Sequence, residues 1–136
     1  MADDLTITFI ARRAGIRASA IRYYESVGLL PAPARINGRR RYDSTILPRL
    51  ALIATAQEMG FTIKEISTLM HGFDPDVPAS ARWRVLAAAK LKEVEALIER
   101  AEGMRQLLGE ALSCGCLSLD SCARAFQTRA AMGSRE

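Results

Sequence analysis

Cysteine is absent from almost all of this 136-residue sequence, because its three cysteines, Cys114, Cys116 and Cys122, fall within nine consecutive positions. Histidine occurs once, and aromatic residues make up 6% of the chain. Three thiols, an odd number, do not indicate a framework of structural disulfides. A thiol enzyme needs a base or cation beside its nucleophile, and only Arg124 lies near the cysteines in the sequence. We therefore do not expect an enzyme.

Long apolar runs are also lacking, and no stretch approaches the roughly 18 residues that a membrane-spanning helix needs. The opening residues, MADDLTITF, are acidic and do not have the charged-then-apolar pattern of a secretion signal. We therefore expect a cytoplasmic protein without a membrane partner. Thiols stay reduced in that compartment, so the three cysteines are expected to be metal ligands or redox centres.

Acidic residues are scarce in one region of the chain. The net charge of the whole sequence is only +4, but nine arginines and two acids, Glu25 and Asp43, lie between Arg12 and Arg49. The net charge of that stretch is therefore +7. Such a concentration of positive charge indicates a polyanionic partner.

The same basic stretch has the pattern of a helix-turn-helix. A short helix is expected over residues 8–14 and is closed by Gly15, because glycine is common just past a helix C-terminus. A second helix is expected to start at Ala18 or Ser19 and to end at Gly28. Two helices joined by a glycine turn within about twenty residues are typical of DNA-binding helix-turn-helix motifs.

A basic hairpin is predicted directly after these helices. Pro31 and Pro33 exclude a helix there, and Asn37-Gly38 is a strong signal for a two-residue hairpin turn. Four arginines surround this turn, at positions 35, 39, 40 and 41. Their guanidinium groups repel one another, and a phosphate backbone relieves that repulsion. The hairpin is therefore predicted to be a DNA-binding wing.

Two further helices are expected over residues 46–59 and 63–70, the second with Thr62 and Glu65 as a capping box. They complete a predicted DNA-binding domain over residues 1–73, which a hinge over residues 74–80 follows. Residues 81–112 are predicted to form a long helix. Seven of eight positions along one stripe of that helix are apolar, the stripe being Ala87, Lys90, Val94, Leu97, Ala101, Met104, Leu108 and Ala111. This spacing predicts a coiled-coil seam, and a second copy of the chain is the simplest partner for it.

The end of the sequence is predicted to sense an effector. Residues 113–126 are expected to form a cysteine-containing effector-binding loop, with a short helical piece from Cys122 to Phe126. Residues 127–136 are expected to be a flexible tail.

Several short motifs carry a resemblance to a known family. They are Arg22-Tyr-Tyr-Glu25, Gly28-Leu-Leu30, Asn37-Gly-Arg-Arg-Arg-Tyr42 and Gln57-Glu-Met-Gly-Phe61. Their order and spacing resemble the MerR family of bacterial transcription regulators. The resemblance implies a mainly α fold: a winged helix-turn-helix, a long antiparallel dimerisation helix and a C-terminal cysteine loop. It also implies a homodimer that binds a palindromic operator and, when its effector is bound, distorts promoter DNA for RNA polymerase and so activates transcription.

Nine residues are candidates for contact with double-stranded promoter DNA. The resemblance implies Arg22, Tyr24, Arg40 and Tyr42. The predicted recognition helix and the wing add Arg17, Ser19, Arg35, Asn37 and Arg41. Arginine reads guanine edges or holds phosphate, so such residues suit both a major groove and a DNA backbone.

Two branches of the family offer different interpretations of the cysteines. The redox-sensing SoxR branch holds a [2Fe–2S] cluster with four cysteines, but Ala111 occupies the first of the four positions here. Copper(I) sensors use two cysteines eight residues apart, as Cys114 and Cys122 are. Divalent-ion sensors add a cysteine near the start of the dimerisation helix, where this chain has Ala79 and Ser80.

We therefore favour a thiophilic metal ion held by Cys114, Cys122 and, in place of the missing ligand, Cys116. Thiolates are soft donors, which favours Cu(I), Hg(II), Cd(II), Pb(II) or Zn(II). The alternative is a SoxR-like redox sensor, with a [2Fe–2S] cluster or reactive thiols. A constitutive architectural DNA-binding protein with inert cysteines is a third interpretation.

Overall fold

The computed structural model describes residues 5–133, and the chain divides into two compact units between Lys92 and Glu93. Each unit is described by itself. None of the helices in the described residues is long and apolar enough to cross a membrane.

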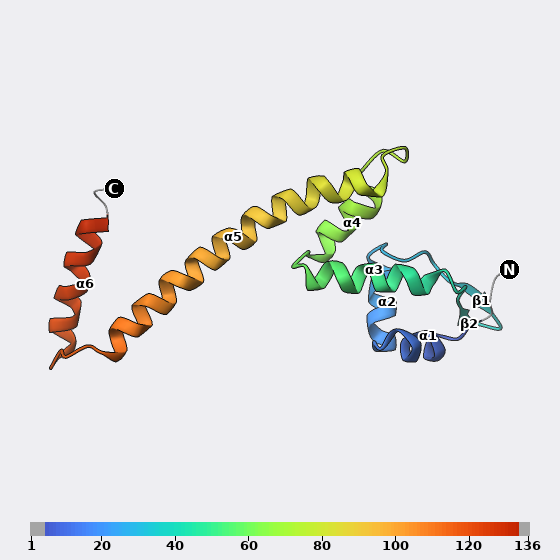
Figure 1. The fold of residues 1–136 in the computed structure, drawn as a ribbon. Coiled ribbons are helices and arrows are strands. Elements are labelled where there is room, and N and C mark those ends of the chain that lie inside the picture. The colour runs from blue at the N-terminus through green and yellow to red at the C-terminus, as the bar shows by residue number, and fades with distance from the viewer. Residues whose placement is uncertain (1–4, 134–136) are drawn as a thin grey trace. The chain divides into compact units, whose positions relative to one another are not determined.

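The N-terminal unit is built of short helices and one hairpin. Figure 1 shows its elements in chain order, namely α1 (Ile7–Ala14), α2 (Ala18–Ser26), β1 (Ala34–Ile36), β2 (Arg39–Arg41), α3 (Ile46–Glu58), α4 (Ile63–His71) and the first part of α5 (Ala79–Leu112). Gly15 ends α1 in the left-handed conformation, with φ of 70°, and α2 begins three residues later. The helix-turn-helix is therefore confirmed, and its turn depends on a glycine.

The predicted wing is a two-stranded antiparallel hairpin. Asn37 and Gly38 both have positive φ, 53° and 79°, as the turn between closely paired strands requires. Arg35 pairs with Arg40 across the hairpin. Beyond β2, Tyr42 forms a bridge to Leu5, and this bridge ties the base of the wing to the start of the chain.

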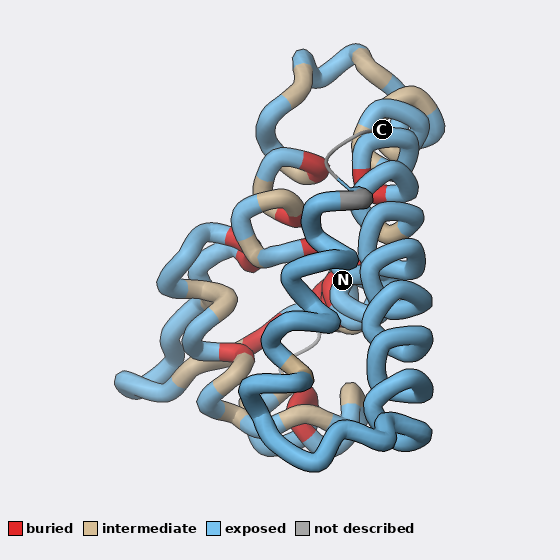
Figure 2. Tube along the Cα trace, turned by 90° about the vertical axis from the view of Figure 1, so that its left-hand side faces the viewer, coloured by how far each residue is buried: buried red, intermediate tan, exposed pale blue. Residues whose placement is uncertain are grey.

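A small core holds the helices of this unit together. Ile10, Ile21, Leu29, Ile53 and Ile66 are fully buried. They come from α1, α2, the segment after α2, α3 and α4, so each element contributes to one cluster. Figure 2 marks buried residues in red. This packing fixes the exposed face of α2 and the wing relative to the rest of the unit.

The start of α5 packs on α4. Lys90 is 9% exposed, and its Nζ donates to Glu65 Oε1 at 2.9 Å. Glu65 also completes the predicted capping box with Thr62, so one carboxylate serves both the N-terminus of α4 and α5. Arg82 donates to the carbonyls of Leu69 and Met70 at the end of α4. The long helix begins at Ala79, two residues before the predicted start.

The C-terminal unit consists of the rest of α5, a turn and α6 (Leu119–Gly133). The prediction of a loose tail from residue 127 is wrong for residues 127–133, which are helical, and residues 134–136 lie outside the described part. Ser118 accepts from the backbone N–H of Ser121 and so caps α6. Four alanines and no proline follow, a composition that sustains a helix once it has begun.

Candidate DNA-binding surface and metal site

Three exposed candidates for DNA contact lie on or next to α2. Arg17 is the N-cap of this helix, Ser19 is in its first turn, and Arg22 follows one turn later. All three are exposed. An exposed helix face with two arginines and a hydroxyl group can donate hydrogen bonds to base edges and to phosphates.

The tip of the wing presents further donors. Arg35 and Asn37 are exposed, and an Nη atom of Arg35 donates to the carbonyl of Gly38 at 3.3 Å. That bond holds the turn in its tight form. Arg41, in β2, is half-buried. The wing is therefore a rigid and basic surface element.

The remaining candidates, Tyr24, Arg40 and Tyr42, bond other side chains of the N-terminal unit. Tyr42 is 3% exposed, and its hydroxyl donates to Glu25. Burial, followed by this hydrogen bond, raises the pKa of Tyr42 well above its ordinary value. Arg40 donates from Nε to the same carboxylate at 3.2 Å, and the hydroxyl of Tyr24 donates to Gln57 at 3.3 Å.

The structure thus presents Tyr42 as a buried support for the wing rather than as an exposed group. Glu25, the residue that joins Tyr42 to Arg40, was not predicted as a functional residue. The sequence held one signal for it, because it is one of only two acids in a stretch with a net charge of +7.

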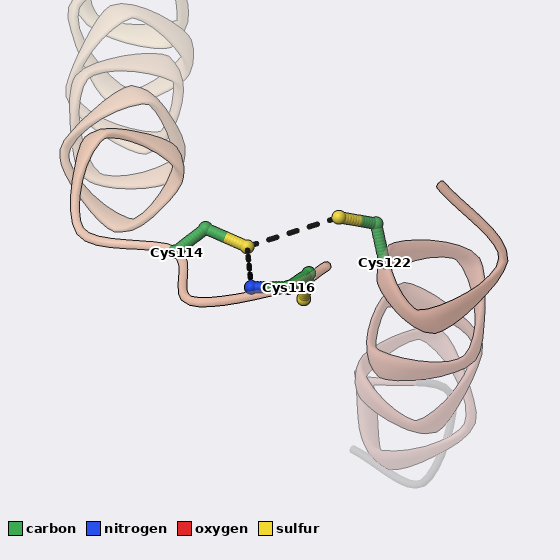
Figure 3. A group of neighbouring side chains, drawn as sticks. All are labelled: Cys114, Cys116 and Cys122. Atoms are coloured by element: carbon green, nitrogen blue, oxygen red, sulfur yellow. Dashed lines mark hydrogen bonds between the residues drawn. The ribbon is translucent and has the colours of Figure 1, made fainter. Parts of the chain in front are cut away.

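The three cysteines come together in the C-terminal unit. Cys114 lies just after α5, Cys116 in the turn and Cys122 in the first turn of α6. Their Sγ atoms all lie within 4.8 Å of one another (Figure 3). Cys114 Sγ is 3.7 Å from Cys122 Sγ and accepts from the backbone N–H of Cys116 at 3.4 Å. Cys114 and Cys116 are exposed, and Cys122 is partly exposed.

The proximity of the thiols splits their acidities. The hydrogen bond from the Cys116 thiol, followed by that from the Cys116 backbone N–H, lowers the pKa of Cys114. The reverse interaction raises the pKa of Cys116 to about 12. The Cys114 thiol is therefore easier to deprotonate than the Cys116 thiol.

The donor set fits a thiophilic ion. A tetrahedral Zn²⁺ bound by thiolates at about 2.3 Å places its sulfurs about 3.8 Å apart, close to the spacing of Cys114 and Cys122. The three cysteines line a pocket together with Glu110, Phe126 and Arg129. A [2Fe–2S] cluster with four cysteine ligands does not fit, because the chain has three cysteines in all.

Comparison with known proteins identifies the family. Residues 5–72 match the model of the MerR HTH family regulatory protein, and residues 47–111 match the model described as MerR, DNA binding. The chain belongs to the MerR family. It is a DNA-binding transcription regulator and not an enzyme, as its sequence predicts.

The relatives of this MerR-family chain include a SoxR homologue, a CueR regulator and a solved regulator in complex with lead(II). The chain is 30% identical to the SoxR homologue of Chromobacterium violaceum, an HTH-type transcriptional activator, over 88% of this chain and 82% of that protein. It is 35% identical to the regulator CueR of Salmonella typhi, over 81% of each chain. The crystal structure of PbrR691 from Ralstonia metallidurans in complex with lead(II) matches with a TM-score of 0.69 and 28% identity, over 84% of this chain and 90% of that one.

Proposed function

We propose that this MerR-family regulator is a homodimeric activator that senses a thiophilic metal ion through Cys114, Cys116 and Cys122. The observation that carries the proposal is the convergence of all three sulfurs of one chain within 4.8 Å at the end of the long helix. All three cysteines of the chain lie within nine residues. Unliganded cysteines are often simply buried in a core, and three exposed or partly exposed thiols at one point differ from that pattern.

The proposed ion is Cu(I), Hg(II), Cd(II), Pb(II) or Zn(II), and the proposed ligands are the three thiolates of one chain. The solved lead(II) complex of PbrR691 supports a soft ion. Ala79 and Ser80, at the start of α5, offer no thiol to a second chain. Cys116 completes the set instead, because the turn after α5 brings two cysteines that are two residues apart toward one point.

A metal ion bound by these thiolates would link the end of α5 to the start of α6. Cys114 follows α5, and Cys122 is in the first turn of α6, so a shared ligand fixes the turn between them. Leu117, Leu119 and Phe126 are exposed and lie in or beside this turn. A fixed turn can present these apolar groups to a second chain, which favours one state of the dimer over another.

The DNA end of the proposal uses the basic surface of the N-terminal unit. Arg17, Ser19 and Arg22 of α2 are proposed to face the major groove, and Arg35, Asn37, Arg40 and Arg41 of the wing to hold the backbone, with Tyr24 and Tyr42 as supports. The proposed target is a palindromic promoter operator, since a two-fold dimer presents two such surfaces. Distortion of that promoter would then realign its two recognition elements for RNA polymerase.

In the experiment, the reduced protein is titrated anaerobically with Cd(II), and the absorbance of the thiolate-to-metal transition measures binding. Transcription from the target promoter is a second readout. Cys114→Ser, Cys116→Ser and Cys122→Ser should each weaken binding by at least about 100-fold, since even indirect supports of a metal site cost 10- to 100-fold. Ser113→Ala, beside Cys114, is the matched control and should bind normally. Normal metal-dependent transcription in the triple variant would refute the proposal.

A redox sensor is the second candidate, and one observation favours it. Cys114 Sγ and Cys122 Sγ are 3.7 Å apart and accessible, close enough for oxidation to join them with little movement. In that case a mild thiol oxidant, with no added metal, would change transcription as much as the metal does. Iron and sulfide in anaerobically purified protein would point instead to a cluster.

A further inference from the structure

Glu25 is an acid at the centre of a basic DNA-binding unit. It lies in the last turn of α2, and its side chain is 10% exposed. One carboxylate oxygen accepts from Arg40 Nε at 3.2 Å, and the other accepts from the hydroxyl of Tyr42. Arg40 is in β2 of the wing, and Tyr42 directly follows that strand. Glu25 therefore joins the recognition helix to the wing through a single carboxylate.

The bond to Glu25 uses only part of the Arg40 guanidinium. Arginine carries five N–H donors in a rigid fork. Nε is engaged with Glu25, and no residue in the described part of the chain accepts from the Nη atoms of Arg40. The side chain of Arg40 is 30% exposed. The guanidinium is thus held through Nε, while its two Nη groups are left for a partner with paired oxygens.

We propose that Glu25 is a positioning residue for DNA binding, which holds Arg40 by Nε so that its Nη groups face a DNA phosphate. The inference rests on the proposed DNA contact of Arg40. Without the carboxylate, the long arginine side chain samples many rotamers, and ordering it on DNA costs binding free energy. A fork that is ordered before binding avoids that cost.

Simple electrostatics predicts the opposite effect for the loss of Glu25. A carboxylate close to a DNA surface repels phosphates, and its removal raises the net charge of the chain by one. If charge alone mattered, any neutral residue at position 25 would tighten DNA binding. If Glu25 positions Arg40, the result depends on whether the neutral residue can still accept a hydrogen bond.

This difference makes alanine and glutamine a matched pair of variants. Glu25→Ala removes both the charge and the acceptor, whereas Glu25→Gln removes the charge and keeps an amide oxygen for Arg40 Nε. We expect Glu25→Ala to weaken binding to a dimer site by about tenfold, since each subunit must order one long side chain. Glu25→Gln should restore binding to at least the wild-type level.

The test measures the dissociation constant over a range of salt concentrations, for a duplex that the wild-type protein selects from a random-sequence pool. Arg40→Gln should weaken binding and reduce the salt slope by about one for each subunit. In the Arg40→Gln background, Glu25→Ala should cause no further loss.

The outcomes separate this inference from the proposed function. If Glu25→Ala binds DNA as tightly as Glu25→Gln while Arg40→Gln is weak, Glu25 does not position Arg40. If Arg40→Gln binds like wild type, the DNA contact of Arg40 is itself wrong, and the inference falls with it. Should Glu25→Ala fail to fold, Arg40→Lys decides the matter, because one ammonium cannot both pair with Glu25 and present a fork. Wild-type affinity of Arg40→Lys would overturn the inference.

Discussion

The two units of this chain bury their apolar side chains in different ways. The N-terminal unit buries isoleucines from α1, α2, α3 and α4 in one cluster, and Ile53 is fully inaccessible. In the C-terminal unit the large apolar side chains of α5 are exposed, Leu97 at 60% and Leu108 at 63%. A unit with its own core can fold within one chain, whereas an apolar helix face of this kind is stable when a partner covers it.

The same contrast divides the work of the molecule. The unit with the core holds the basic surface in a fixed shape. The unit with the exposed stripe holds the cysteines in an open turn, where few contacts resist a change of conformation. The proposed sensor needs a rigid DNA-binding end and an adaptable effector-binding end, and the following predictions test whether the two units differ in this way.

The largest effect should come from the core of the N-terminal unit. Ile53→Ala removes three buried carbons from a site with no solvent access. The free energy of unfolding should fall by about 3 kcal/mol, the usual cost of such a cavity. Urea denaturation monitored by the Trp83 fluorescence measures it, and the loss should not depend on protein concentration. A loss below about 1 kcal/mol would contradict a closely packed core.

A smaller effect, of a different kind, should come from the stripe on α5. Leu97→Ala should leave the unfolding of the N-terminal unit unchanged and weaken the homodimer by about 2 kcal/mol, or about 30-fold, because each chain loses about 1 kcal/mol of burial. Sedimentation equilibrium measures the dissociation constant. Glu99→Ala, on the solvated face of the same helix, is the control. Equal dimer affinity of the Leu97 and Glu99 variants would show that the stripe is not the seam.

Local sequence rules were sufficient where the structure depends on neighbouring residues. Gly15 ends α1, Asn37-Gly38 makes the hairpin turn, and Thr62 and Glu65 form the capping box, all as predicted. Each of these features is set by the conformation or hydrogen bonds of residues within a few positions. The family motifs and the three cysteines were likewise recognisable without coordinates.

Contacts between distant residues were not predictable in the same way. Lys90 interrupts the apolar stripe in the sequence, and only packing against α4 explains it, since its ammonium group bonds Glu65 and lies 5.5 Å from the centre of the Phe61 ring. The convergence of Glu25, Arg40 and Tyr42 depends on how the wing folds back onto α2. The extent of α6 was missed because an alanine-rich segment without a strong apolar stripe resembles a tail.

The smallest effect should come from a local feature of the N-terminal unit, the carboxylate of Glu65. A hydrogen bond from the Thr62 backbone N–H, followed by that from Lys90, lowers the pKa of Glu65 below its ordinary value of 4.5. A lowered folded-state pKa gives stability that is present above the ordinary value and lost as the pH falls through the folded value. Glu65→Gln should therefore lower the free energy of unfolding by about 1 kcal/mol at neutral pH, a typical contribution of a helix cap.

The pH dependence separates this contribution from simple packing. As the pH falls from neutral through the lowered pKa of Glu65, the wild-type carboxyl binds a proton, so wild type and Glu65→Gln should approach equal stability. Urea denaturation at neutral pH and at the lowest pH at which both proteins fold measures the difference. Glu102→Gln, at an exposed position of α5 beyond the N-terminal unit, is the control and should show little difference at either pH. If Glu65→Gln were less stable than wild type by the same amount at both pH values, the charge of Glu65 would not be what stabilises the N-terminal unit. The bond between Glu65 of α4 and Lys90 of α5 would then make no electrostatic contribution.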